Sequence, residues 1–171
     1  YKRQDSISRN LMSQGHLKKL IDQGLLGVTS NPSIFQKAIS QEGGGYEKDI
    51  QRMAKRGAST LEIYDALTIT DIQNACDLFL PVYEKSKREH GYVSLEVLPG
   101  LAFDRRRTVS EAKRLFRRVG RPNVMIKVPA TAPGIPAVRE LIGEGININI
   151  TLMFSLKHYQ DVAEAYICLL Y

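Results

Sequence analysis

The residue that raises the first chemical question is Lys127, which lies in the middle of the apolar run Asn123-Val124-Met125-Ile126-Lys127-Val128-Pro129-Ala130-Thr131. Turn residues flank this run, so we predict a short strand over residues 124–128 that is buried on both faces. Burial disfavours the ammonium form of a lysine and lowers its pKa, and a neutral amine can attack a carbonyl to form a Schiff base. The alternative is a lysine at a strand end that reaches solvent or pairs with a carboxylate.

Polar residues near the ends of other predicted strands could take part in a reaction at such a lysine. Successive side chains of a strand point to opposite faces, so the polar residues of each strand can be grouped by parity. The groups are Thr29 with Asn31, Ser94 with Glu96, Lys127 with Met125, and Asn147 with Asn149 and Thr151. In a barrel, amide, carboxylate, amine and hydroxyl groups at the same ends of neighbouring strands would converge in one active site. The alternative is a set of unrelated polar residues that fill a barrel interior.

The elements that must position these residues alternate along the chain. We expect strands over residues 1–5, 25–30, 92–98, 124–128 and 146–152, and helices over 8–23, 33–40, 46–56, 110–119, 137–142 and from 155 onward. This alternation is typical of parallel strands joined by right-handed helical crossovers. Between residues 46 and 90 we expect helices alone, because capping-box patterns at Ser59–Glu62 and Thr70–Gln73 each predict a helix start.

The predicted fold class is therefore α/β, with an interior that holds the polar strand faces. We expect a partial (β/α)8 TIM barrel that comprises about the first five βα units, as one incomplete domain over 1–171 with a helical insertion at 46–90 between strands 2 and 3. A complete barrel needs about 250 residues, and this chain has 171. It opens at Tyr1 without a methionine and stops inside a predicted helix, so both ends look cut.

Composition narrows the possible classes of protein. The chain is 43% hydrophobic, but no apolar run approaches 18 residues, and no signal segment begins it. We therefore expect a soluble, cytoplasmic protein that binds no membrane. Cys76 and Cys168 have no short spacing that would indicate a metal site or a disulfide framework.

The net charge of +6 is concentrated in residues 103–122, which contain eight basic residues and only two acidic ones, Asp104 and Glu111. The basic residues are Arg105, Arg106, Arg107, Lys113, Arg114, Arg117, Arg118 and Arg121. Apolar residues recur between them at helical spacing, so the basic side chains occupy the outer face of an amphipathic helix. This pattern indicates a solvated face, or a face that attracts phosphorylated small molecules or nucleic acid. Phe116 belongs to the apolar face of this helix, so no aromatic interleaving supports single-strand binding.

Several ordered motifs resemble the successive strands of transaldolase. They are Gly27-Val28-Thr29-Ser30-Asn31-Pro32-Ser33-Ile34-Phe35, Val93-Ser94-Leu95-Glu96-Val97, Val124-Met125-Ile126-Lys127-Val128-Pro129-Ala130-Thr131 and Asn147-Ile148-Asn149-Ile150-Thr151-Leu152. Asp5-Ser6-Ile7-Ser8-Arg9 resembles the end of the first barrel strand of that family. The insertion at 46–90 resembles the one that the family carries between its second and third strands.

The resemblance implies a role for each residue. Lys127 would be the Schiff-base lysine that attacks the ketone of a ketose phosphate. Asp5 would take the proton of the C4 hydroxyl as the C3–C4 bond breaks. Glu96, with a water held near Thr151, would act as general acid and base. The iminium would accept the electrons, so no metal and no organic cofactor is expected.

The same resemblance implies that Asn31 and Asn149 bind the hydroxyls of a dihydroxyacetone unit. The reaction would belong to the pentose phosphate pathway. Donors would be fructose 6-phosphate or sedoheptulose 7-phosphate, and acceptors erythrose 4-phosphate or glyceraldehyde 3-phosphate. The resemblance implies no nucleic acid partner and is compatible with a homo-oligomer. The family's phosphate-binding residues would lie beyond Tyr171. The family usually has an apolar strand where this chain has Tyr1-Lys2-Arg3-Gln4.

Two other functions stay open at this point. One is a fructose 6-phosphate aldolase-like lyase, which releases dihydroxyacetone instead of transferring it; the helical insertion argues against this function. The other is a non-catalytic barrel fragment whose basic helix binds an anionic partner. We expect the transfer reaction of the complete protein, and not turnover by these 171 residues alone.

Overall fold

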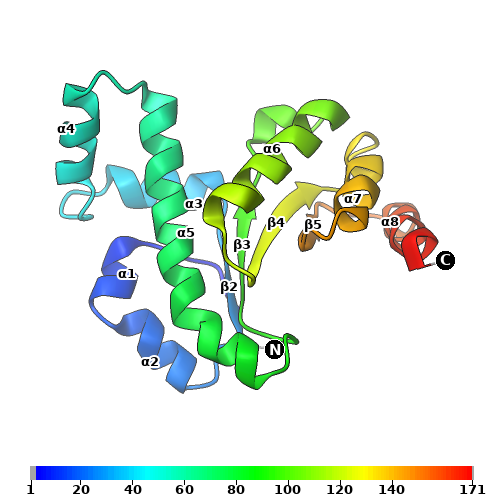
Figure 1. Cartoon of the computed structure of the whole chain (residues 1–171), viewed down its shortest axis with the longest axis horizontal. Coiled ribbons are helices and arrows are strands. Elements are labelled where there is room, and N and C mark those ends of the chain that lie inside the picture. Colours follow the sequence, from blue (N-terminus) through cyan, green and yellow to red (C-terminus); the bar gives the residue numbers. More distant parts are fainter. Residues whose placement is uncertain (1–2, 171) are drawn as a thin grey trace. The chain divides into compact units, whose positions relative to one another are not determined.

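The computed structural model describes residues 3–170, in which strands alternate with helices (Figure 1). Two compact units are present: Tyr1–Val93 with Arg121–Asn123, and Ser94–Gly120 with Val124–Tyr171. Hydrogen-bonded strands follow the order of the chain, from β1 to β5, and β3 (Tyr92–Glu96) begins in the first unit and ends in the second. The α/β class is confirmed, whereas the single domain over 1–171 stays a prediction.

The first unit begins with two short strands that pair in parallel. β1 (Arg3–Gln4) lies beside β2 (Gly27–Thr29), with Arg3 opposite Gly27. The strand predicted over residues 1–5 ends one residue earlier, at Gln4, and Tyr1 and Lys2 lie outside the described residues. After β2, helix α3 (Pro32–Ser40) begins with a proline at its first position, which suits a helix start because its missing N–H would have no partner there.

The helix predicted over residues 8–23 is wrong as one element. Two helices stand there, α1 (Arg9–Ser13) and α2 (His16–Asp22), separated by Gly15 at φ +72°. A left-handed residue ends an α-helix, and glycine adopts this conformation at little cost. The Ser8 side chain caps α1 by accepting a hydrogen bond from Leu11 N.

The helical insertion consists of α4 (Glu47–Lys55) and α5 (Thr60–Lys85), which lie side by side (Figure 1). The predicted capping box at Ser59 and Glu62 is confirmed, with both reciprocal hydrogen bonds present. The predicted second start at Thr70 is wrong, because α5 continues through it. The Thr70 hydroxyl bonds back to Ala66 O at 2.8 Å, so it does not act as an N-cap.

A buried asparagine joins α5 to the segment that leads into β3. Asn123 is fully buried and donates from Nδ2 to Cys76 O and to Gly91 O, both at 2.9 Å. Gly91 lies at φ +83°, and a Cβ there would meet Tyr83 N at 2.4 Å. Only glycine therefore fits this close approach of the backbone to α5.

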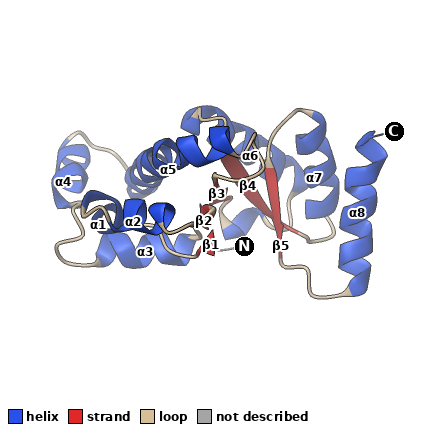
Figure 2. Ribbon diagram, turned by 90° about the horizontal axis from the view of Figure 1, so that it is seen from below, coloured by secondary structure: helices blue, strands red, loops and turns tan. Residues whose placement is uncertain are grey.

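The second unit contains the end of β3 and the elements that follow it. These are a 3-10 turn (Pro99–Leu101), α6 (Arg105–Val119), β4 (Val124–Pro129), α7 (Gly134–Gly143), β5 (Ile148–Thr151) and α8 (Leu156–Leu170). Helices α6, α7 and α8 pack against one another in succession, and α8 lies beside α7 (Figure 2). Helix α6 begins five residues before its predicted start because Asp104 caps it, accepting from Arg107 N at 2.9 Å.

The strand of Lys127 alternates in burial as parity predicts, but only one of its faces is fully buried, whereas burial on both faces was expected. In β4, Val124, Ile126 and Val128 are fully buried, whereas Met125 and Lys127 are half-buried. β4 pairs in parallel with β5, with Lys127 opposite Asn149 and Pro129 opposite Thr151. This register brings the polar face of each strand to the same side.

Candidate active site

Lys127 and Glu96 form an ion pair in the second unit. Nζ of Lys127 lies 3.1 Å from Oε2 of Glu96, and the two side chains are 12% and 20% exposed. Strand pairing sets this distance, because Val97 N donates to Lys127 O at 3.3 Å and so holds β3 against β4. Because both side chains are largely buried and adjacent, a proton can pass between the amine and the carboxylate.

Asn149 extends this pair across the next strand. It is the partner of Lys127 in the β4–β5 register, and its Nδ2 donates to Ser94 Oγ at 3.0 Å. Ser94 is buried and lies two residues before Glu96, on the same face of β3. Parity predicts Ser94 on this face, but the sequence gives no signal that it bonds to the asparagine.

Thr151 contributes a buried hydroxyl that is available to form hydrogen bonds. Its Oγ1 is buried and has no hydrogen-bond partner within the described part of the chain. Buried hydroxyls normally have a partner, so such a group suits a bound water or a ligand. The structure thus brings Lys127, Glu96, Asn149 and Thr151 together in the second unit.

The other two predicted site residues belong to the first unit. Asp5 follows β1 directly and is exposed. Asn31 has an extended backbone, at φ −148°, and its Oδ1 caps α3 by accepting from Ile34 N at 2.9 Å. The cap commits the carbonyl oxygen of Asn31, so its Nδ2 is the group that could bind a ligand hydroxyl.

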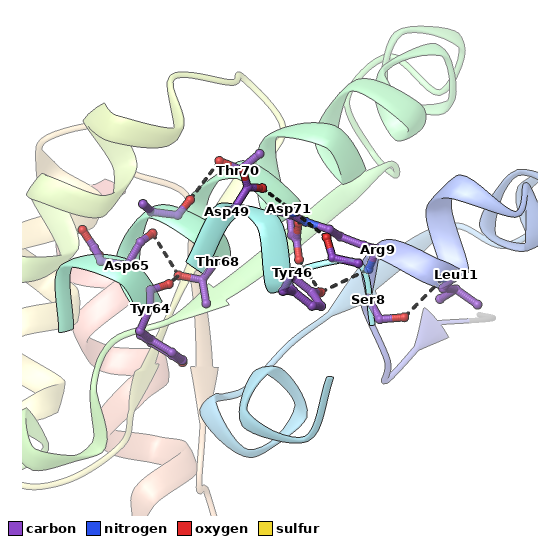
Figure 3. Close-up of polar contacts among 12 residues, drawn as sticks. Ser8, Arg9, Leu11, Tyr46, Asp49, Tyr64, Asp65, Thr68, Thr70 and Asp71 are labelled. Atoms are coloured by element: carbon purple, nitrogen blue, oxygen red, sulfur yellow. Dashed lines mark hydrogen bonds and ion pairs between the residues drawn. The ribbon is translucent and has the colours of Figure 1, made fainter. Parts of the chain in front are cut away.

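A buried charge network in the first unit was missed by the sequence reasoning (Figure 3). Arg9 Nε donates to Asp71 Oδ1 at 3.1 Å, and its Nη1 donates to Asp49 Oδ2 at 2.6 Å. The guanidinium lies over the Tyr46 ring, 4.5 Å from its centroid. The Tyr46 hydroxyl donates to Asp71 Oδ2 at 2.6 Å and accepts from Arg9 N at 3.1 Å.

Burial dominates the electrostatics of this network. It raises the pKa of the fully buried Asp71 carboxyl, although the bonds from Tyr46 and Arg9 act in the opposite direction. Burial and the bond to Asp71 also raise the pKa of Tyr46. The network fixes α1, four residues after Asp5, to the insertion helices α4 and α5.

The basic segment is largely neutralised by neighbouring carboxylates. Within the second unit, Arg105 bonds to Glu140 at 2.9 Å, Lys113 to Glu144, and Arg114 to Glu111 at 2.8 Å. In the first unit, Arg121 bonds to Asp77 at 2.6 Å. At least four of the eight basic residues between 103 and 122 therefore have an acidic partner.

Among residues 3–170, no group of three or more His, Cys, Asp or Glu side chains is arranged to hold a metal ion. Over the same residues, no helix has the length and the apolar character that crossing a membrane requires. Cys76 is buried, and burial raises the pKa of its thiol to about 12. The side chain of Cys168 lies outside the described residues.

Known proteins are similar in sequence to this chain. Residues 4–170 match the family model described as Transaldolase/Fructose-6-phosphate aldolase. The chain belongs to the transaldolase/fructose-6-phosphate aldolase family. Its parallel strands β1, β2, β4 and β5, alternating with helices, agree with part of the TIM barrel of this family.

Individual family members are similar over almost the whole chain. A protein named Transaldolase 2 from Nostoc punctiforme is 48% identical over 164 residues, which are 95% of this chain and 43% of the relative. A Transaldolase from Trichodesmium erythraeum is 48% identical with the same shares, and one from Thiobacillus denitrificans is 48% identical over 45% of its length. The chain thus spans less than half the length of these relatives.

Proposed function

We propose that the protein to which these residues belong is a transaldolase that transfers a dihydroxyacetone unit between sugar phosphates through a Schiff base on Lys127. The observation that carries this proposal is the 3.1 Å pair of Lys127 and Glu96, flanked by Asn149 and Thr151. An amine, an acid–base carboxylate and a hydroxyl that can hold water are the groups that Schiff-base formation requires. Membership of the family supports the same chemistry.

The reaction begins at the ketone of the donor. The Lys127 amine adds to C2 of fructose 6-phosphate or sedoheptulose 7-phosphate, and Glu96 protonates the resulting oxygen through a water bound at Thr151. Loss of water leaves an iminium. Asn149 and Asn31 bind the hydroxyls of the three-carbon unit, which keeps it oriented during the next step.

Carbon–carbon cleavage then uses the iminium as the electron acceptor. Asp5 removes the proton of the C4 hydroxyl, the C3–C4 bond breaks, and its electron pair moves to the iminium to give an enamine. The aldose phosphate departs with the C4 oxygen as its aldehyde. Attack of the enamine on erythrose 4-phosphate or glyceraldehyde 3-phosphate, followed by hydrolysis, returns the free amine of Lys127.

Reductive trapping tests the assignment of the nucleophile. The complete protein is incubated with fructose 6-phosphate and borohydride, and the adduct is located by peptide mass. We expect modification of Lys127 and its loss in Lys127→Met, whereas Lys113→Met, which removes a paired lysine of α6, keeps the adduct. An unmodified Lys127 in a folded sample overturns the proposal.

A lyase of the fructose 6-phosphate aldolase type is the second candidate, because the matched family includes both activities. The two are separated by supplying fructose 6-phosphate with and without erythrose 4-phosphate to the complete protein. Transfer yields sedoheptulose 7-phosphate, and a lyase yields free dihydroxyacetone without an acceptor. Binding of a nucleic acid through α6 receives less support, since Arg105, Lys113 and Arg114 of this helix are paired with carboxylates.

A further inference from the structure

The segment that joins β1 to α1 carries Asp5, and its backbone is held on both sides of this residue. Before it, Gln4 pairs with Val28 in the β1–β2 register. After it, Ile7 is fully buried, and Arg9 begins α1. The Asp5 side chain is exposed and has no hydrogen bond or ion pair within residues 3–170, so this backbone determines where its carboxylate lies.

The buried phenol of Tyr46 holds the start of α1. Its hydroxyl accepts from Arg9 N at 3.1 Å and donates to Asp71 Oδ2 at 2.6 Å (Figure 3). The Arg9 side chain donates to the other oxygen of Asp71, Oδ1, at 3.1 Å, and to Gly45 O at 3.0 Å. The N–H of a first helical residue has no partner within its own helix, so an acceptor from outside fixes the place where the helix starts.

The geometry of this network is well defined, because its buried oxygens all have partners. Both Asp71 oxygens accept a hydrogen bond, and the Tyr46 hydroxyl both donates and accepts. A buried network that is fully satisfied makes the local structure rigid, whereas a buried ion pair adds little net stability compared with apolar packing. Tyr46 directly precedes α4, and Asp71 lies in α5, so the helical insertion supplies both groups that hold Arg9.

We propose that Tyr46 and Asp71 are positioning residues for Asp5 in the carbon–carbon cleavage step. They hold the backbone of Arg9, four residues further along the chain, and so keep the Asp5 carboxylate at the end of β1 in place to take the proton of the C4 hydroxyl. The inference rests on the proposed function, because it assigns a role within one step of that reaction. Addition of Lys127 to the ketone does not use Asp5, so the network acts on cleavage and not on Schiff-base formation.

Tyr46→Phe tests the inference in the complete protein. The variant keeps the ring under the Arg9 guanidinium but removes the hydroxyl that binds Arg9 N. Release of glyceraldehyde 3-phosphate from fructose 6-phosphate in a single turnover measures cleavage. Borohydride trapping with dihydroxyacetone measures Schiff-base formation alone, because this ketone has no C4 hydroxyl. We expect release to slow about tenfold or more, and trapping to stay within about twofold.

Asp71→Asn is the second variant. It keeps the shape of the side chain but removes the charge that binds Arg9 and Tyr46, so it should divide the two rates in the same way. It also tests the inference if Tyr46→Phe does not fold. Circular dichroism shows which variants are folded before their rates are compared.

Asp5→Asn distinguishes a positioning role from a purely structural one. Loss of the general base should slow release about 10²- to 10⁴-fold. A residue that acts through Asp5 has nothing left to position in this background, so adding Tyr46→Phe should slow release by no more than about twofold further. A network that only stabilises the fold would slow release by the same factor in both backgrounds, or lower the trapping rate as well.

Ile72→Val is the matched control on α5. Ile72 is fully buried and follows Asp71, so the loss of one methyl group weakens the packing but keeps the bonds of the network. This variant should release glyceraldehyde 3-phosphate within about twofold of the unchanged protein. Undiminished release in Tyr46→Phe, or equal slowing in both backgrounds, overturns the inference alone. An unchanged protein that forms no adduct at Lys127 overturns the proposed function and this inference together.

Discussion

Nζ of Lys127 lies 3.1 Å from Oε2 of Glu96, and the two side chains come from neighbouring strands. The register of β3 and β4 therefore determines the distance between a nucleophile and its acid–base partner. Because strand pairing is rigid on the scale of a side chain, both groups are held in place before substrate arrives.

The first prediction concerns Glu96 as the proton-transfer group. Glu96→Gln keeps the size of the side chain but removes its charge, so Schiff-base formation should slow about 10²- to 10⁴-fold. The measurement is the time course of borohydride trapping with fructose 6-phosphate. Glu111→Gln is the control, because Glu111 pairs with Arg114 on α6, and it should leave the rate unchanged. Equal rates in the unchanged chain and Glu96→Gln would remove Glu96 from the mechanism.

Thr151 allows stability and chemistry to be separated. Its buried hydroxyl has no partner among the described residues, so Thr151→Val should leave the free energy of unfolding within about 0.5 kcal/mol or raise it slightly. If the hydroxyl holds the water that Glu96 uses, the trapping rate should fall at least about tenfold. Urea denaturation and trapping kinetics on the same sample measure the two effects.

Thr131→Val is the matched control for this substitution. The Thr131 hydroxyl donates to Ala102 O and accepts from Gly134 N at 3.1 Å, so its loss should cost about 1–2 kcal/mol. A loss of stability in Thr151→Val as large as in Thr131→Val contradicts an unbonded hydroxyl at position 151.

The sequence predicts what depends on local periodicity. Alternation along β4 predicts which residues are buried, and Lys127 is accordingly half-buried between the fully buried Ile126 and Val128. The same parity places Glu96, Asn149 and Thr151 on the polar faces of their strands. These assignments succeed because a strand has a period of two, and a shift by one residue would expose its apolar side chains.

The sequence fails where a distant partner decides the role of a residue. Thr70 and Asp71 have the pattern of a helix start, yet Asp71 lies in the middle of α5 and binds Arg9, 62 residues away. A capping pattern indicates only which bonds are possible, and tertiary contacts decide which of them form. No local signal pairs Arg9 with Tyr46 and Asp71, so the network could be found only in the structure.

The buried network should make Asp71 essential to stability. Asp71→Asn removes the buried carboxylate that accepts from Arg9 and Tyr46 and leaves Arg9 paired with Asp49 alone, so the loss of these charged hydrogen bonds should cost about 1.5–3 kcal/mol. The measurement is the free energy of unfolding from urea denaturation. Asp77→Asn is the matched control on the same helix, because Asp77 is half-exposed and its pair with Arg121 should contribute about 1 kcal/mol or less. Equal losses in the two variants would contradict the special role of burial at Asp71.

Tyr46 predicts how stability changes at alkaline pH. Burial, followed by its bond to the Asp71 carboxylate, raises the pKa of Tyr46 in the folded chain, whereas the unfolded chain has the ordinary value of about 10. Above that pH the phenol ionises in the unfolded chain but stays protonated in the folded chain. Ionisation therefore stabilises the unfolded state alone, and the free energy of unfolding falls. The contribution of Tyr46 is therefore fully present below pH 10 and is lost as the pH rises, by about 1.4 kcal/mol for each pH unit.

Tyr46→Phe removes this titration. At neutral pH it should be less stable than the unchanged chain by about 1–3 kcal/mol, since a buried carboxylate loses a hydrogen bond at 2.6 Å. Between pH 10 and 11 the difference between the two chains should shrink by about 1 kcal/mol, because only the unchanged chain carries the phenol. Urea denaturation at pH 8, 10 and 11 measures it. A difference that stays constant over this range would mean that Tyr46 titrates alike in the folded and unfolded chain.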